Sequence, residues 1–159
     1  MLNEKISELL RKREFVSVST CDLEGRPNAA PKFILKVSGN FIYLIDYTIG
    51  RTWSNLKANP RASVSFMDTD SLSGYQINGK AQIIDGGAEY EKIGAELLQR
   101  EIDLSARRII EGVGREKRHA GFEVGLSEKF VLLKIHIEEI VEIGLRGEVK
   151  REHIQGELC

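Results

Sequence analysis

Cysteine and histidine are scarce in this chain of 159 residues. The two cysteines, Cys21 and Cys159, provide neither a disulfide framework nor the spacing of metal ligands. The three histidines are scattered along the chain, and none lies at ligand spacing from another. We therefore predict no metal site.

An excess of charge of one sign is also missing. Lys and Arg number 23 and Asp and Glu number 24, which removes the main electrostatic reason to expect a nucleic-acid partner. No apolar run approaches the roughly 20 residues that cross a bilayer. The first residues, MLNEKISELLRKREF, are charged throughout, unlike a signal peptide. We expect no membrane partner and a cytoplasmic protein.

The chain contains 42% hydrophobic and 30% charged residues, a balance typical of a globular protein. Its length predicts one domain over 1–159. Six segments are predicted as strands: 15–20, 28–38, 41–46, 62–68, 74–84 and 128–143. Apolar and polar residues alternate in segments such as 15–20, 62–68 and 74–84, as in half-buried strands, whereas 41–46, FIYLID, is a short apolar run. Short turns join the first three segments into a meander. Gly79, in mid-strand, predicts a bend or a close backbone approach.

Helical patterns lie between and before these strands. Residues 2–12 form an amphipathic helix with Asn3 as a plausible N-cap, and a short helix at 53–58 ends at Asn59–Pro60. Residues 88–127 are an insertion, helical over 88–111 with a break near 103–105, and 144–159 is a polar tail. The fold class is mainly β (α+β): a six-stranded antiparallel split barrel, formed by 1–86 and 128–143, with peripheral helices.

The stretch YLIDYTIGRTWSNLKANP, residues 43–60, places Arg51 and Thr52 where the short helix begins. A helix N-terminus offers unpaired N–H groups and partial positive charge, so a guanidinium and a hydroxyl there suit a terminal phosphate. The alternative is that Thr52 is only the N-cap and Arg51 a surface residue. From these residues alone the two interpretations stay open.

Three longer stretches carry a resemblance: FVSVSTCDLEGRPNAAPKFILK, GRTWSNLKANPRASVSF and INGKAQII. With the N-terminal helix, and in this order and spacing, they resemble the pyridoxamine 5′-phosphate oxidase-like, FMN-binding split-barrel family. The resemblance covers roughly residues 5–86, and the last strand more loosely. It implies that FMN is bound at the second strand, the end of the third strand and the short helix, through Pro31, Lys32, Phe33, Ile34, Ile45, Asp46, Tyr47, Arg51 and Thr52.

Two of these positions depart from the family pattern. Thr52 stands where a second basic residue is common, and Asp46 stands where a hydroxyl residue is common. An acid near a phosphate is unfavourable unless it points elsewhere. Lys32 is a candidate cation for the reduced flavin, and its alternative is an outward-pointing strand lysine.

Lys36 matches the lysine that helps bind the substrate phosphate in the vitamin-processing oxidases. The Arg- and Trp-rich C-terminal region of those enzymes has no counterpart in 144–159, so we expect no pyridoxamine phosphate oxidase activity. The resemblance implies an FMN-dependent oxidoreductase of unknown substrate, acting as a homodimer with flavin at the interface. The alternatives are a non-enzymatic flavin or haem-binding electron-transfer protein and a reductase that uses the deazaflavin F420. No catalytic acid or base is assigned, and whether the protein is an enzyme stays open.

Overall fold

The computed structural model describes residues 4–99 and 130–154. The chain divides into two compact units, Met1–Ile84 with Phe130–Cys159 and Asp85–Lys129. Within the second unit, residues 88–99 form a helix. The predicted break near 103–105 and the rest of the predicted insertion, up to 127, lie outside the described residues, as does Asn3.

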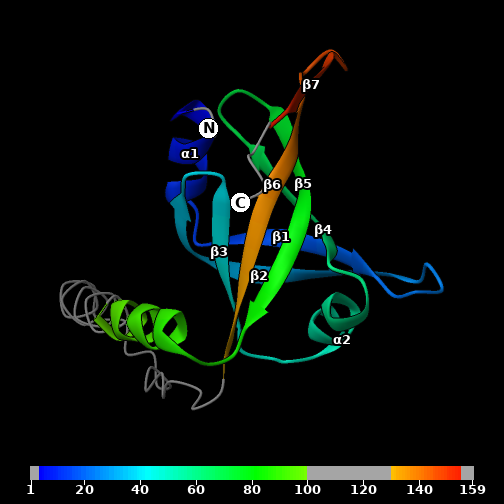
Figure 1. The fold of residues 1–159 in the computed structure, drawn as a ribbon. Helices are drawn as coiled ribbons and strands as arrows, with labels where there is room; N and C mark the ends of the chain where they lie inside the picture. The colour runs from blue at the N-terminus through cyan, green and yellow to red at the C-terminus, as the bar shows by residue number, and fades with distance from the viewer. Residues whose placement is uncertain (1–3, 100–129, 155–159) are drawn as a thin grey trace, which may run out of the picture. The chain divides into compact units, whose positions relative to one another are not determined.

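The first unit is a β-barrel. The sheet order is β3-β2-β1-β4-β5-β6-β7 and every pairing is antiparallel. Because β3 also pairs with β6, the first six strands close on themselves, and β7 extends the edge of β6 (Figure 1). The bounds are β1 (Phe15–Cys21), β2 (Pro27–Ser38), β3 (Phe41–Asp46), β4 (Arg61–Asp68), β5 (Ser73–Ile84), β6 (Val131–Ile143) and β7 (Val149–His153).

The predicted six-stranded antiparallel barrel is confirmed, but the polar tail holds a strand that the sequence did not predict. All five residues of β7 are exposed, so its segment has no buried face to reveal it. It forms because the second half of β6 offers a free edge, pairing Glu139–Ile143 with β7. The first half of β6 is already paired with β3.

The helices α1 (Glu4–Arg11) and α2 (Arg51–Ala58) pack against the barrel. The core is formed by side chains that alternate inward along the strands, together with apolar residues of both helices. Its largest fully buried members include Leu10, Ile42, Leu44, Tyr75, Ile77, Leu133, Ile135 and Ile137. Each buried Leu or Ile contributes about 1.5–3 kcal/mol. Among the described residues, no helix has the length and apolar character needed to cross a membrane.

Gly79 lies at an irregularity in the β5–β6 pairing, between Asn78 and Gly79, as its place in mid-strand predicts. A Cβ atom on Gly79 would collide with the backbone carbonyl of His136. Backbone cannot rotate away as a side chain can, so only glycine fits here.

We expect Gly79→Ala to lower the free energy of unfolding by about 1–3 kcal/mol, because the added methyl group overpacks this contact. Urea denaturation measures the loss. Gly74→Ala, in the same strand, is the control, since its Cβ would meet Ile143 Cβ at an ordinary 3.7 Å. Equal stability of the two variants would contradict the prediction.

Candidate functional site

The loop between β3 and α2 begins the candidate site. Helix α2 starts at Arg51, two residues before the predicted start, and its N-cap is Gly50, which makes no side-chain capping bond. Thr52 therefore lies inside the first turn, and its interpretation as the N-cap is wrong. The N–H groups of this turn are left for solvent or a ligand. Just before the cap, Ile49 has φ +43°, a left-handed conformation that is rare for a β-branched residue.

A buried ion pair lies where β3 runs into this loop. Lys32 Nζ is 2.7 Å from Asp46 Oδ1, and the two side chains are only 5% and 0% exposed. Lys32 therefore does not point outward, and the alternative of an outward-pointing strand lysine is wrong. The charge of Asp46 is compensated, so it does not face a neighbouring anion unopposed.

Thr48 completes the cluster. Its backbone N–H and its hydroxyl both donate to Asp46 Oδ1, at 3.0 and 2.7 Å, and Lys32 Nζ lies 3.3 Å from Thr48 Oγ1. Burial raises the pKa of the Asp46 carboxyl, but the hydrogen bonds from Lys32 and Thr48 outweigh it, and the net pKa is lowered. Asp46 is thus an anion that ties the loop to β2.

The second oxygen of Asp46 differs from the first. Oδ1 accepts three hydrogen bonds, whereas Oδ2 is buried and has no partner in the described part of the chain. A buried acceptor without a donor costs about 1–3 kcal/mol. The end of β3 therefore holds an acceptor whose donor the described residues do not supply.

A second polar cluster lies beneath the first turn of α2. Asn28 Nδ2 donates to Thr52 Oγ1 at 3.1 Å, and Asn55 Nδ2 donates to Thr20 Oγ1 at 3.1 Å. Thr20, Thr52 and Asn55 are buried. Sequence reasoning missed Thr20, Asn28 and Asn55. The signal for Thr20 and Asn28 was a polar residue at an inward position of β1 or β2, where an apolar one is expected, whereas Asn55 lies on the buried face of α2.

Aromatic rings lie on the other side of the loop. Phe33 is half-exposed, and its ring meets Tyr47 edge-on with centroids 6.1 Å apart; Tyr47 in turn meets Phe130 at 6.3 Å. Pro31 is exposed, as Phe33 is, whereas Ile34 lies in the barrel core. Ile45 is buried and pairs with Phe33 in the β2–β3 register.

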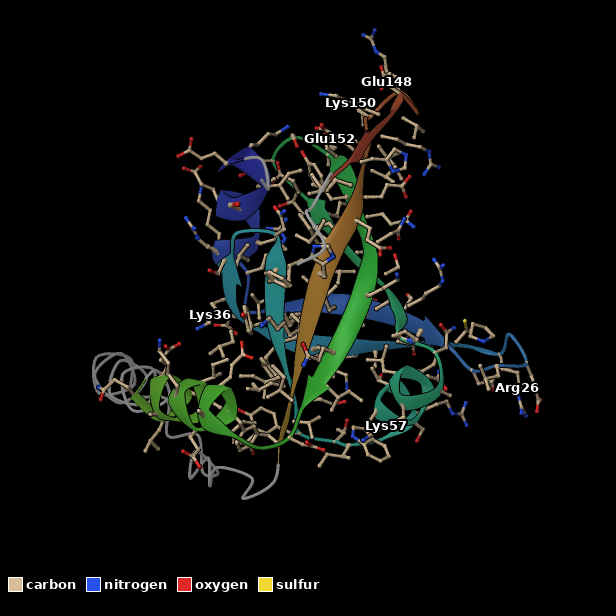
Figure 2. The ribbon with its side chains drawn as sticks, in the orientation of Figure 1. Arg26, Lys36, Lys57, Glu148, Lys150 and Glu152 are labelled. Atoms are coloured by element: carbon tan, nitrogen blue, oxygen red, sulfur yellow. The ribbon has the colours of Figure 1, made fainter. Side chains whose placement is uncertain are left out.

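Of the predicted site residues, Lys36 is the one that lies apart from the loop between β3 and α2. Arg51 is exposed at the start of α2 and makes no hydrogen bond or ion pair with the described residues. Lys36 instead lies four residues beyond Lys32, roughly 13 Å along β2, with its ammonium over the Tyr43 ring at 5.1 Å. In Figure 2, Lys36 lies to the left of the barrel strands, and α2, marked by Lys57, lies to their lower right.

The family model described as pyridoxamine 5′-phosphate oxidase matches residues 2–143. The chain belongs to this family. No curated protein matches its sequence.

Solved structures agree with the family fold. A pyridoxamine 5′-phosphate oxidase-related, FMN-binding protein of Nostoc punctiforme is 15% identical, with 98% of this chain and 100% of that chain covered and a TM-score of 0.58. A haem-binding protein of Mycobacterium smegmatis is also 15% identical, covering 96% and 59%, with a TM-score of 0.60. An F420 reductase is 16% identical, covering 88% and 98%, with a TM-score of 0.53. At these identities the likeness shows the fold alone.

Replacing Asp46 with Asn leaves the Lys32 ammonium buried without its counter-ion. We expect the free energy of unfolding at pH 7 to fall by about 3–5 kcal/mol, measured by urea denaturation. The double variant Lys32→Met with Asp46→Leu removes both charges and recovers most of the loss, because no buried charge is left unpaired.

The pH dependence follows from the lowered pKa of Asp46. A carboxyl whose pKa is lower in the folded state stabilises the protein at pH values above its unfolded-state pKa. This stabilisation is lost as the pH falls through its folded-state pKa. The stability gap between wild type and Asp46→Asn should therefore narrow in acid. A gap that widens as pH falls would contradict an ionised Asp46.

Proposed function

We propose that the protein is an FMN-binding flavoprotein that acts as an oxidoreductase. The observation that carries the proposal is the uncapped first turn of α2, with the exposed guanidinium of Arg51 at its start and the Thr52 hydroxyl inside it. Backbone N–H groups, a helix dipole and a guanidinium together form a site for a phosphate dianion. Membership of the family and the FMN-binding relative from Nostoc punctiforme support it.

The surrounding residues fit the rest of the FMN molecule. Lys32 neutralises Asp46, so the acid does not repel a phosphate bound nearby. No described residue donates to Oδ2 of Asp46, and the ribityl chain next to the FMN phosphate carries hydroxyl donors. Phe33 presents a half-exposed ring for apolar contact with the isoalloxazine. When bound, FMN supplies hydride or electron transfer.

Lys32 is less suited to the role of stabilising a reduced flavin anion. Its ammonium is already paired with a buried carboxylate at 2.7 Å. The protein's contribution to flavin chemistry is therefore binding and orientation, with no free cation from Lys32. The reaction proposed here is not that of the oxidase that gives the family its name, because residues 144–159 contain no counterpart of the Arg- and Trp-rich region that completes the substrate site of that enzyme.

Titration with FMN tests the proposal, with absorbance and flavin fluorescence as readouts. We expect micromolar binding by the wild type and at least a tenfold weaker affinity for Arg51→Ala, since a charge-assisted hydrogen bond contributes about 1.5–3 kcal/mol. Lys57→Ala, an exposed cation at the other end of the same helix, is the matched control and should bind as the wild type does. A purified protein that retains F420 or haem and does not bind FMN would show that the proposed cofactor is wrong.

The proposal includes a homodimer with the flavin at its interface. Phe15 and Phe33 are directly opposite on β1 and β2, and their side chains are 59% and 50% exposed. Two large exposed rings on neighbouring strands are an apolar surface of the kind that subunits cover. A second copy of this chain is the proposed partner.

Light scattering should therefore give twice the mass of one chain. We expect the double variant Phe15→Ser with Phe33→Ser to be a monomer, because it removes the apolar rings from the interface. Leu145→Ser is the control, since Leu145 is 69% exposed and lies in the turn before β7. A wild-type monomer, or a double variant that stays dimeric, would refute this surface.

A further inference from the structure

Thr52 receives a hydrogen bond whose direction matters. Asn28 Nδ2 donates to Thr52 Oγ1 at 3.1 Å, and an amide nitrogen has only protons to offer. Thr52 Oγ1 therefore uses a lone pair toward Asn28 and keeps its own proton for another acceptor. Among the described residues no acceptor is recorded for that proton, although the side chain is only 2% exposed.

Asn28 is itself held in place. Its amide lies 3.5 Å from Thr20 Oγ1, and Asn55 of α2 donates to the same oxygen at 3.1 Å. The three residues join β1, β2 and α2 through one polar cluster inside the end of the barrel. Asn28 is thus fixed from β1 and presents its amide to the first turn of the helix.

A second observation comes from the end of β3, where the loop to α2 begins. Asp46 is fully buried, and its Oδ2 has no donor among the described residues. Asn28, which donates to Thr52, and Lys32, which pairs with Asp46, both point inward on β2, four residues and roughly 13 Å apart along the strand. An elongated ligand that carries a phosphate at one end and hydroxyl groups further along has the chemistry to reach both.

We propose that Asn28 is a positioning residue that turns the Thr52 hydroxyl proton toward the phosphate of the bound ligand. The inference rests on the proposed function and adds the residue that sets the direction of one donor. Where the family commonly has a second basic residue, this chain has a neutral hydroxyl, and a hydroxyl can bind a phosphate as a donor only if its proton is directed there. Asn28 gives that direction without adding charge.

A double-mutant cycle on FMN affinity tests this. We expect Asn28→Ala and Thr52→Val each to weaken FMN binding roughly tenfold. Because Asn28 acts through Thr52, adding Asn28→Ala to Thr52→Val should cost less than a further twofold. Thr52→Ser keeps the hydroxyl and should bind FMN as the wild type does. Riboflavin, which lacks the phosphate, should bind the wild type and all four variants equally.

The variant Asn28→Asp is a second test, because it keeps a side chain of similar size and changes only its hydrogen-bonding groups and charge. An ionised carboxylate accepts the Thr52 proton and turns it away from the phosphate, so this variant should bind FMN more weakly than Asn28→Ala. Asn78→Ala is the control for loss of a strand asparagine, since Asn78 Nδ2 donates to Glu139 at 2.6 Å on β6. Its FMN affinity should be unchanged, and urea denaturation shows whether each variant is folded.

The outcomes separate the two proposals. Additive effects of Asn28→Ala and Thr52→Val, an unchanged FMN affinity of Asn28→Ala, or an equal loss for riboflavin would overturn the role of Asn28 and leave FMN binding standing. Failure of the wild type to bind FMN would overturn both.

Discussion

Pairing between β3 and β6 is the constraint on which the rest of the structure depends. It runs from Phe41 with His136 to Asp46 with Val131 and turns an open sheet into a barrel. The closure fixes the last residue of β3, so the chain must leave the barrel at Asp46. The chain must then pass through the loop and α2 to reach β4. Strand β4 pairs with the edge of β1 that faces away from β2. The site lies where this crossing begins.

The buried Lys32–Asp46 pair fixes the end of β3 at a cost in desolvation. Both charges lose their hydration, and a buried pair of this kind is no more stabilising than apolar residues of the same size. What the pair provides is position: Oδ1 of Asp46 gathers three donors from β2 and from the loop. These bonds hold a loop in which Ile49 adopts a left-handed backbone conformation that an isolated chain would avoid.

The strands could be predicted from sequence because alternation is a strong signal where one face is buried. Strand β3 was predicted at its observed bounds, and the five other barrel strands to within a few residues. Strand β7 could not be, since no face of it is buried and only its partner β6 determines it. The burial of Lys32 and Asp46 could have been predicted from the sequence. Lys32 is two residues from Ile34 and Asp46 is two residues from Leu44, so each shares a strand face with a core residue. That the two side chains meet follows from the β2–β3 register, which alternation alone does not give.

The clustering of the site has a consequence for how it can recognise an anion. Lys32 and Asp46 cancel, Thr48 and Thr52 are neutral, and Arg51 is the one cation that the described residues place at the start of α2. With so little net charge, affinity must come from donors held in direction rather than from a field. Preorganised N–H and O–H groups lose little entropy on binding, and both polar clusters fasten the loop and helix to the same strand. In the proposed phosphate site, donors that strand β2 holds in direction thus take the place of the charge of a second basic residue.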